Sequence, residues 1–558
     1  MVFGSPEEPR LTGKEKLKFF LAVHWRGICC VVIPLIALPI ILPPPIEDYE
    51  WCAFTLVVMA CFWVTECIPL PITSFLPIII FPITGVNSTS ATCAAYISDS
   101  LLMFLGSLVL ASCVEQSGLH VRLAYFAVRT IGFTHIRLLL SMSLVTMFVS
   151  MWITNTAAVT MMVPINFAVL KVFEEQKLIT IFEYTADGER IASDITTCYF
   201  CAATFSATIG GLGTLVGTAT NLVMKGLLVK SFPLVPEYLS FPKFSAFTIP
   251  MMICLQATTL ICMNVFFLGW LRPTSAAAKR SYVTPQGQAA AKAAVDASWK
   301  KLGGITFWEY MVILLFGGSM ILFFCRSPQM FPGWGDILED VFDRPHKFIR
   351  DSALAYLVGF LMLVSPSNLS FFKNFTVKYY EQLPKKPVSS VLDWKKMDAS
   401  LPYSFMFLLG GGFALSDAAK KSGLNHKIGE SMSVLKACPN AIVLLIIVFV
   451  VTFVTNFASN VAVCNVFVPL VMELAKQINR NPMWYCLAGG LSSSYCFMMP
   501  VGTPGNLVVQ SSASIATSKM MVAGAGPTVC TVFLTWFFLY FWAPIIWPDL
   551  TTVPFWVN

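Results

Sequence analysis

Two short polar motifs interrupt apolar segments in opposite halves of the chain. Thr154-Asn155 lies in the first half and Ser459-Asn460 in the second. Asparagine offers both a hydrogen-bond donor and an acceptor, and a hydroxyl group does the same. Such groups bind carboxylates through N–H and O–H donors and small cations through oxygen. A single motif of this kind is typical of polar contacts between membrane helices, but its repetition favours a binding site.

A second pair of motifs places glycine and hydroxyl residues before an asparagine. G-T-A-T-N occupies residues 217–221 and G-T-P-G-N occupies residues 502–506. Pro504 has no N–H and leaves a helical carbonyl without its usual partner. Gly213 and Gly217 alone would also fit close packing between helices. We expect an unwound helix in each half that turns hydroxyls and backbone carbonyls toward a cation or a substrate.

Ionisable residues are nearly absent from the apolar segments. Glu66, Glu115 and Asp417 stand at or near segment ends, where we expect them to be solvated. A proton-driven pump normally carries ionisable groups within its spans. The sequence also lacks a nucleotide-binding loop, an HExxH motif and a zinc-cysteine cluster. It therefore predicts that the protein is not an enzyme and has no cofactor, with sodium possible only as a coupling ion.

The elements that position these motifs are predicted to be membrane helices. Hydrophobic residues form 56% of the 558 residues, charged residues form 12%, and the mean hydropathy is +0.72. A soluble domain carries about twice that share of charge. Many apolar blocks approach or exceed the roughly 18 residues of a membrane span. The predicted fold class is an all-α polytopic membrane protein.

The two halves repeat one another. Asn155 and Asn460 are as far apart in the sequence as Pro164 is from Pro469. The motifs at 217–221 and 502–506 are closer together, because the first copy contains the polar stretch 174–190. The predicted parts are a cytoplasmic N-terminus with the first transmembrane helix (1–50), repeat 1 (51–272), a cytoplasmic linker (273–305), repeat 2 (306–547) and an external C-terminal tail (548–558).

Loop charge predicts that the repeats are inverted. Basic residues place the N-terminus, the 273–305 linker and the loop 367–400 in the cytoplasm, and the acidic loop 327–351 is predicted outside. The lysine-rich segment 420–436 is the one exception, since the repeat places it outside. Blocks 138–172 and 440–475 are each too long for one helix and too short for two spans. We expect them to form re-entrant hairpins with the polar pairs at their tips.

Several longer motifs resemble a known family. M-W-I-T-N-T-A-A-V-T-M-M-V-P-I, F-A-S-N-V-A, L-L-G-G-G-F-A-L and M-P-V-G-T-P-G-N together resemble the divalent anion/sodium symporter family, which is similar to solute carrier family 13. Within it, the chain resembles the animal di- and tricarboxylate branch and its insect "I'm not dead yet" subgroup. The resemblance implies about 11 transmembrane helices, two re-entrant hairpins, a homodimer and an elevator-type transport mechanism.

The resemblance also implies roles for individual residues. The implied substrate contacts are Asn155, Thr156, Thr218, Asn460 and Val461. The implied cation sites are Ser150, Thr154, Asn155 and Gly217 in the first, and Ser459, Asn460, Gly502 and Thr503 in the second. Three departures from the family pattern weaken the expectation of sodium coupling: Thr154 replaces a serine, Val461 replaces a hydroxyl residue, and Val463-Cys464-Asn465 follows the second motif.

The predicted function is secondary active transport of citrate, succinate and related citric-acid-cycle intermediates across the plasma membrane. The sequence leans to cation-independent exchange, with sodium-coupled symport as the alternative and an anion channel as a distant one. The expected partners are these carboxylates, membrane lipid and a second copy of the chain, and no nucleic acid. Any N-linked glycan is expected at Asn87, whereas Asn368 and Asn374 are predicted to be cytoplasmic and unmodified.

Overall fold

The computed structural model describes residues 12–557 except 43, 178, 185–187, 273, 281, 346, 380, 382, 384–385 and 432–435. The described chain is mostly helical. A single two-stranded antiparallel hairpin, β1 and β2, lies in the polar insert of the first half and departs slightly from the all-α prediction.

The first half contains the following elements, in chain order: α1 (Gly13–Ala37), η1 (Leu38–Ile40), α2 (Asp48–Thr65), α3 (Leu70–Thr73), α4 (Leu76–Thr84), α5 (Thr89–Ala94), α6 (Asp99–Ser117), α7 (Leu119–Ile131), α8 (His135–Ser150), α9 (Asn155–Glu175), β1 (Phe182–Tyr184), β2 (Arg190–Ala192), α10 (Asp194–Gly210), α11 (Ala219–Ser231), α12 (Phe241–Phe267), α13 (Ala276–Arg280) and α14 (Pro285–Leu302).

The second half continues with α15 (Phe307–Arg326), α16 (Trp334–Val341), α17 (Asp351–Val364), η2 (Ser370–Phe372), α18 (Lys373–Thr376), α19 (Trp394–Ser400), α20 (Ser404–Lys421), α21 (Leu424–Ser431), α22 (Asn440–Thr455), α23 (Asn460–Gln477), α24 (Pro482–Ser492), α25 (Pro504–Ala513), α26 (Thr517–Phe537), η5 (Phe538–Trp542), α27 (Ala543–Ile546), η6 (Pro548–Thr551) and η7 (Phe555–Val557).

By length and composition, six helices of the described chain could each cross a membrane. A seventh is added if α19 and α20, which meet at a bend of 53°, form one span. The remaining apolar helices are short or interrupted, so length alone does not reach the predicted count of 11. The six are Gly13–Ile40, Thr89–Ser117, Asn155–Glu175, Phe241–Phe267, Phe307–Arg326 and Thr517–Ile546.

Each predicted hairpin block is two helices joined by a short turn. In the first half, α8 ends at Ser150 and α9 begins at Asn155, and the two helices pack against each other. In the second half, α22 ends at Thr455 and α23 begins at Asn460, again in contact. The polar pairs thus lie where one helix stops and the next begins, as the sequence predicts.

A helix break follows each hairpin and is braced by an asparagine. Between α10 and α11, the Nδ2 atom of Asn221 donates to the carbonyls of Gly211 (3.0 Å) and Thr214 (2.8 Å). Between α24 and α25, the Nδ2 atom of Asn506 donates to the carbonyls of Cys496 (3.0 Å) and Met499 (2.9 Å). Unwound carbonyls need such partners away from water. The two breaks are therefore held by the same pattern of bonds.

One set of inter-loop contacts joins segments that the sequence predicts outside. The Lys421 Nζ atom donates to Asn87 Oδ1 (3.2 Å), and Arg350 forms an ion pair with Asp99 (3.4 Å). Lys421 belongs to the lysine-rich segment whose external placement goes against the charge rule. Its contact with Asn87 brings together two segments that are both predicted to be external.

A second set of contacts joins segments that the sequence predicts inside. The Asp393 N–H donates to Gln116 Oε1 (2.9 Å). Arg122 pairs with Glu309 (3.0 Å) and donates to the Gly303 carbonyl (2.8 Å). The predicted linker is largely helical, since it contains α13 and α14, and α14 packs on α7 and α9.

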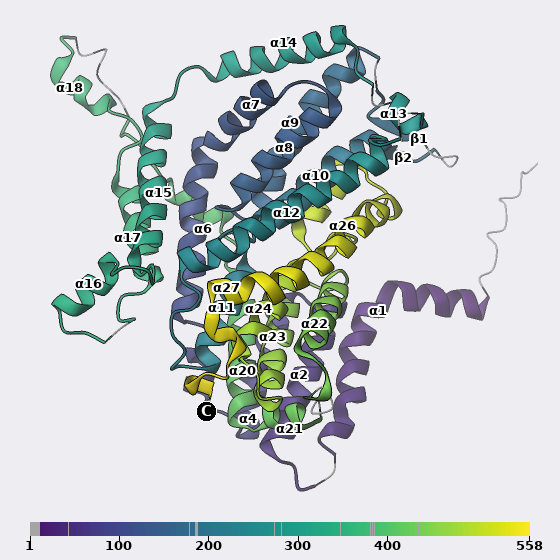
Figure 1. The fold of residues 1–558 in the computed structure, drawn as a ribbon, viewed down its shortest axis with the longest axis vertical. Coiled ribbons are helices and arrows are strands. Elements are labelled where there is room, and N and C mark those ends of the chain that lie inside the picture. The colour runs from purple at the N-terminus through teal and green to yellow at the C-terminus, as the bar shows by residue number, and fades with distance from the viewer. Residues whose placement is uncertain are drawn as a thin grey trace, which may run out of the picture.

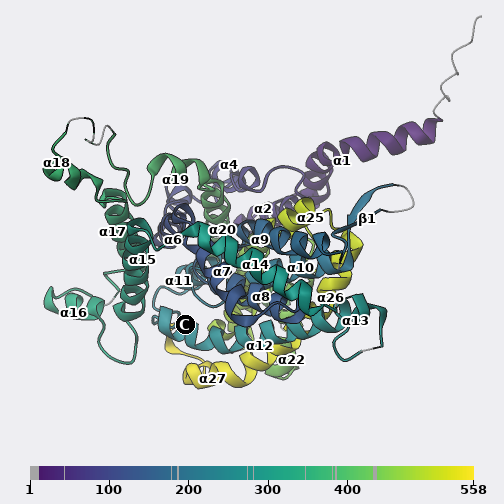
Figure 2. The same ribbon diagram turned by 90° about the horizontal axis from the view of Figure 1, so that it is seen from above.

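Two parts of the molecule stand beside the main helical body (Figures 1 and 2). The pair α15 and α17 lies at one side, where it contacts α6, and α1 lies at the opposite side. In the body, α12 and α26 run side by side, and α14 crosses over α7 and α9 (Figure 1). The C-terminal residues do not form a free tail, because Trp556 is buried with its ring 5.2 Å from that of Phe232.

Candidate functional site

Both hairpin tips and both helix breaks line one cavity of about 590 Å³. The predicted substrate contacts and cation-site residues all contribute to its wall except Ser150, which lies behind Asn155. The predicted residues at the cavity are Thr154, Asn155, Thr156, Gly217, Thr218, Ser459, Asn460, Val461, Gly502 and Thr503.

Four helices begin at this cavity. Their N-cap residues all carry hydroxyl groups: Thr154 for α9, Thr218 for α11, Ser459 for α23 and Thr503 for α25. The first turn of a helix has N–H groups without intrahelical partners and carries a partial positive charge. Helix N-termini therefore attract carboxylates and phosphates. The convergence of four such ends makes the cavity suitable for an anion although no cationic side chain lines its described wall.

The first hairpin tip is an oxygen-rich cluster centred on Asn155. The Ser150 hydroxyl lies 2.8 Å from Asn155 Oδ1 and 2.7 Å from the Ala207 carbonyl. Ser150 itself is fully buried. The hydroxyl of Thr154 accepts a hydrogen bond from the Ala157 N–H and so caps α9. The cluster fixes the orientation of the Asn155 amide at the start of the helix.

The second hairpin tip has the same geometry around Asn460. The Thr455 hydroxyl lies 2.8 Å from Asn460 Oδ1 and 2.6 Å from the Ser493 carbonyl. Thr455 is absent from the predicted site residues, which is an omission. It stands as far from Ser150 in the sequence as Asn460 stands from Asn155, so the repeat contained the signal that identifies it.

The two asparagines differ in their amide nitrogens. Asn460 Nδ2 donates to the Ser494 carbonyl (3.2 Å), and the residue is 8% exposed. Asn155 Nδ2 has no hydrogen-bond partner among the residues that the structure describes, and Asn155 is only partly buried. Asn155 therefore has an unused donor at the cavity. Asn460 contributes through its position at the helix start rather than through a spare N–H group.

Glycine is required where the breaks approach the hairpin tips. A Cβ atom on Gly217 would lie 2.6 Å from the Gly211 carbonyl oxygen and 3.0 Å from that of Met151. A Cβ atom on Gly502 would lie 2.6 Å from the Thr455 carbonyl oxygen. The 2.6 Å contacts are shorter than a Cβ atom allows, so both glycines let backbone oxygens of the break and the tip lie close together.

Two carboxylates also line the cavity, which the sequence did not predict. Glu66 follows the end of α2, and Glu115 lies near the end of α6. Their positions at segment ends suggested solvated residues outside any site. The packing instead brings both segment ends to the cavity wall, together with Phe104, Leu108 and Ser112 of α6. A ligand in this cavity thus faces four helix N-termini and two acidic side chains.

Comparison with known proteins identifies the family of the chain. The chain matches the description "Sodium:sulfate symporter transmembrane region" over residues 21–548. It is 35% identical over 555 residues to the Drosophila melanogaster "Protein I'm not dead yet", covering 97% of this chain and 93% of that protein. It is 31% identical over 530 residues to human "Solute carrier family 13 member 2", covering 88% of each chain.

One further relative and one solved structure extend the comparison. The Caenorhabditis elegans "Sodium-dependent low-affinity dicarboxylate transporter 1" is 31% identical over 538 residues, covering 90% of this chain and 88% of that protein. The solved structure of the Alcanivorax borkumensis YdaH transporter is similar in fold, with a TM-score of 0.51 at 14% identity, covering 81% of this chain and 86% of that one. The chain therefore belongs to the family of sodium:sulfate symporter transmembrane regions, and it is a membrane transporter rather than an enzyme.

Proposed function

We propose that the chain is a secondary active transporter of di- and tricarboxylates, including citrate and succinate, at the plasma membrane. The observation that carries the proposal is the convergence of four helix N-termini with hydroxyl N-caps on one cavity. Relatives whose names specify dicarboxylates support the substrate class. A volume of about 590 Å³ leaves room for a small carboxylate together with water.

The chemistry of recognition follows from neutral donors. The unpaired Nδ2 of Asn155 and the Thr156 and Thr218 hydroxyls donate to carboxylate oxygens, and the first-turn N–H groups of α9 and α23 add partial positive charge. Val461 has no hydroxyl and makes an apolar contact. Because these groups do not titrate near neutral pH, the binding strength depends on the charge of the ligand and on the fixed dipoles around it.

We further propose 11 transmembrane helices, two re-entrant hairpins, inverted repeats and a homodimer that works by an elevator mechanism. The matched breaks after α8, α10, α22 and α24 support the repeat, since each half has a hairpin followed by an interrupted helix. Counting α3–α4, α10–α11 and α24–α25 as interrupted spans raises the number of crossings above the six found by length. The proposed orientation places the N-terminus in the cytoplasm and the C-terminus outside.

The proposed coupling mode is carboxylate exchange without a cation. Thr154 supports it, because its extra methyl group lies at the first oxygen cluster. Residues 463–465 give less support than the sequence suggests, because none of them lines the cavity. Cys464 instead points its sulfur at the Thr220 carbonyl, 3.7 Å away.

Sodium-coupled symport is the second candidate, and the paired oxygen clusters favour it. Ser150 and Asn155 meet the Ala207 carbonyl at one tip, and Thr455 and Asn460 meet the Ser493 carbonyl at the other. Hydroxyl, amide and carbonyl oxygens are the ligands that hard cations take in proteins. In this mode sodium is a co-transported substrate rather than a resident cofactor.

Uptake by purified protein in proteoliposomes tests the proposal. Labelled succinate and citrate should accumulate saturably, and unlabelled carboxylate inside the vesicle should accelerate the uptake. Exchange predicts that uptake persists when choline replaces sodium, whereas symport predicts that it vanishes. Conductance that never saturates would identify a channel. The absence of any carboxylate flux from correctly inserted protein would refute the proposed substrate class.

A further inference from the structure

Each of the two cavity carboxylates lies near the C-terminal end of a helix. α2 ends just before Glu66, and α6 ends just after Glu115. Gln116, next to Glu115, bonds to Asp393 in a segment predicted to be cytoplasmic. The cavity wall also includes Ser400, the last residue of that segment, and Leu401 and Pro402, which follow it. Both acids therefore stand on the predicted cytoplasmic side of the hairpin tips.

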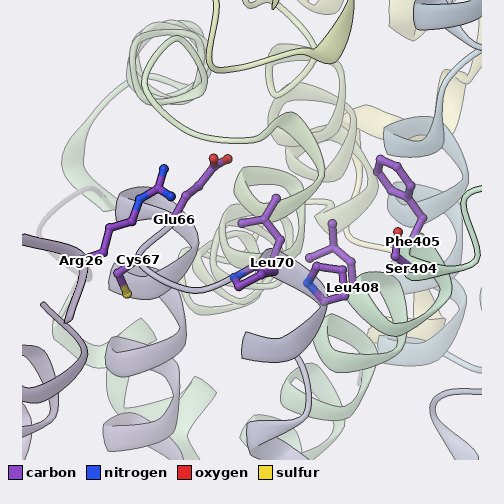
Figure 3. A pocket seen from close by; sticks show the side chains of 9 residues that line it. Arg26, Glu66, Cys67, Leu70, Ser404, Phe405 and Leu408 are labelled. Atoms are coloured by element: carbon purple, nitrogen blue, oxygen red, sulfur yellow. The ribbon is translucent and has the colours of Figure 1, made fainter. Parts of the chain in front are cut away.

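A second cavity of about 380 Å³ adjoins the first on this side. It shares Glu66, Leu70 and Phe405 with the first cavity and adds Arg26 of α1. Figure 3 shows the Arg26 and Glu66 side chains projecting into this same space. Arg26 is the one cationic residue on the described walls of the two cavities. A ligand that leaves the hairpin tips in this direction passes the guanidinium group of Arg26 and the carboxylates of Glu66 and Glu115.

The charge of Glu115 is not neutralised by a direct contact. Its carboxylate forms no ion pair or hydrogen bond with residues that the structure describes, and its side chain is exposed at the cavity. Glu66 likewise forms no close ion pair in the described chain, but Arg26 lies near enough to act on its charge. Glu115 therefore repels a bound anion, and Arg26 partly offsets the repulsion that Glu66 exerts.

We propose that Glu66 and Glu115 weaken carboxylate binding when the site faces the predicted cytoplasmic side, and thereby promote release there. This inference rests on the proposed function as a carboxylate transporter. Both residues lie outside the hairpins, and α6 packs against α15 and α17. When the hairpin tips turn to the other side of the membrane, they leave these acids behind and the repulsion ends. The affinity of the site then differs between its two orientations.

Neutralising the two acids and neutralising Arg26 should shift the Michaelis constant for succinate in opposite directions. Glu115→Gln removes a repulsive charge, so the Michaelis constant for succinate measured from the cytoplasmic side should fall about ten-fold, which corresponds to ~1.4 kcal/mol. Glu66→Gln should lower it less, because Arg26 already offsets that charge. Arg26→Gln should raise it. Citrate, with more negative charge, should show larger shifts than succinate in all three variants.

Sealed right-side-out and inside-out vesicles from cells that express each variant provide the two measurements. Glu115→Asp keeps the charge and should keep the wild-type constant. Glu175→Gln, an exposed glutamate at the end of α9 outside both cavities, is the matched control and should change neither side. From the external side, all variants should resemble the wild type.

The outcomes separate this inference from the function on which it rests. Wild-type vesicles that show no saturable succinate counterflow would refute the proposed function. Counterflow with unchanged cytoplasmic constants, or with equal changes on both sides, would overturn the role of the two acids alone. If Glu115→Gln fails to reach the membrane, the opposite shifts expected for Glu66→Gln and Arg26→Gln decide the matter.

Discussion

Asn155→Asp is the sharpest test of anion binding at the hairpin tip. The substitution keeps the shape of the side chain and keeps an acceptor for the Ser150 hydroxyl, which lies 2.8 Å from Oδ1. It replaces the unpaired Nδ2 donor with an oxygen that carries negative charge. A carboxylate in the first turn of a helix is stabilising, by about 0.3–1 kcal/mol. The variant should therefore fold and reach the membrane normally.

The expected loss of binding has two parts. A hydrogen bond to a charged partner is worth about 1.5–3 kcal/mol. A like charge about 5 Å from the ligand, at an effective dielectric constant of about 20, adds ~3 kcal/mol of repulsion. The sum of roughly 5 kcal/mol corresponds to an affinity loss of more than about a thousand-fold. Uptake of succinate into proteoliposomes should fall below detection.

Asn440→Asp is a matched control. Asn440 is likewise the first residue of a hairpin helix, α22, but it does not line the cavity. Its Oδ1 accepts hydrogen bonds from Arg480 (3.1 Å) and Tyr485 (2.7 Å), so a negative charge there has a cationic partner. Uptake by this variant should match the wild type. Near-normal uptake by correctly inserted Asn155→Asp would refute anion binding at the start of α9.

Three other outcomes follow from the structure. Asn460→Ala should abolish uptake while the protein still reaches the cell surface, because it removes the amide that joins the second tip to its helix break; transport at the wild-type rate would contradict this. Gly210→Ala should lower the thermal unfolding temperature in detergent, since its Cβ would press on the Met147 carbonyl of α8, and overpacking costs about 1–3 kcal/mol; Gly317→Ala, with no neighbour within 4 Å, is the control. Asn374 should carry no N-linked glycan, so its replacement should not change the electrophoretic mobility of the protein before or after glycosidase treatment. Asn87 is itself a poor glycan acceptor because its Nδ2 is buried. A glycan on Asn374 would overturn the proposed topology.

The repeat explains why so much of the site could be predicted. Motifs repeated in the two halves identified the hairpin tips and the helix breaks, which together supply ten predicted residues to the cavity wall. The same spacing also points to Thr455, because Phe148-Val149-Ser150 matches Phe453-Val454-Thr455, although the predicted site did not include it. The positions at which helices begin and end could thus be predicted, because glycine, proline and N-cap hydroxyl residues affect the helix in which they lie.

The acidic wall could not be predicted in this way. Glu66 and Glu115 lie at the ends of apolar segments. Hydropathy indicates where a segment leaves the membrane, but it does not indicate the direction in which a side chain points. Only the tertiary arrangement brings the end of α6 and the α2–α3 turn to the wall of the cavity that the hairpin tips also line. The helix in the linker was not predicted either, although Pro285 at its start and the alanines along α14 favour a helix; contact with α7 and α9 fixes its position.

The neutrality of the hairpin tips has an electrical consequence. Threonine, serine, asparagine, valine and glycine at the four helix ends carry no formal charge, so an unloaded site that moves through the membrane field does no electrical work of its own. Each elementary charge that does move is worth about 2.3 kcal/mol per 100 mV. The net charge moved in each transport cycle therefore equals the charge of the carboxylate plus the charge of any ion transported with it. Voltage-clamp recordings would count co-transported ions directly, and one-for-one exchange of equally charged carboxylates would be electrically silent.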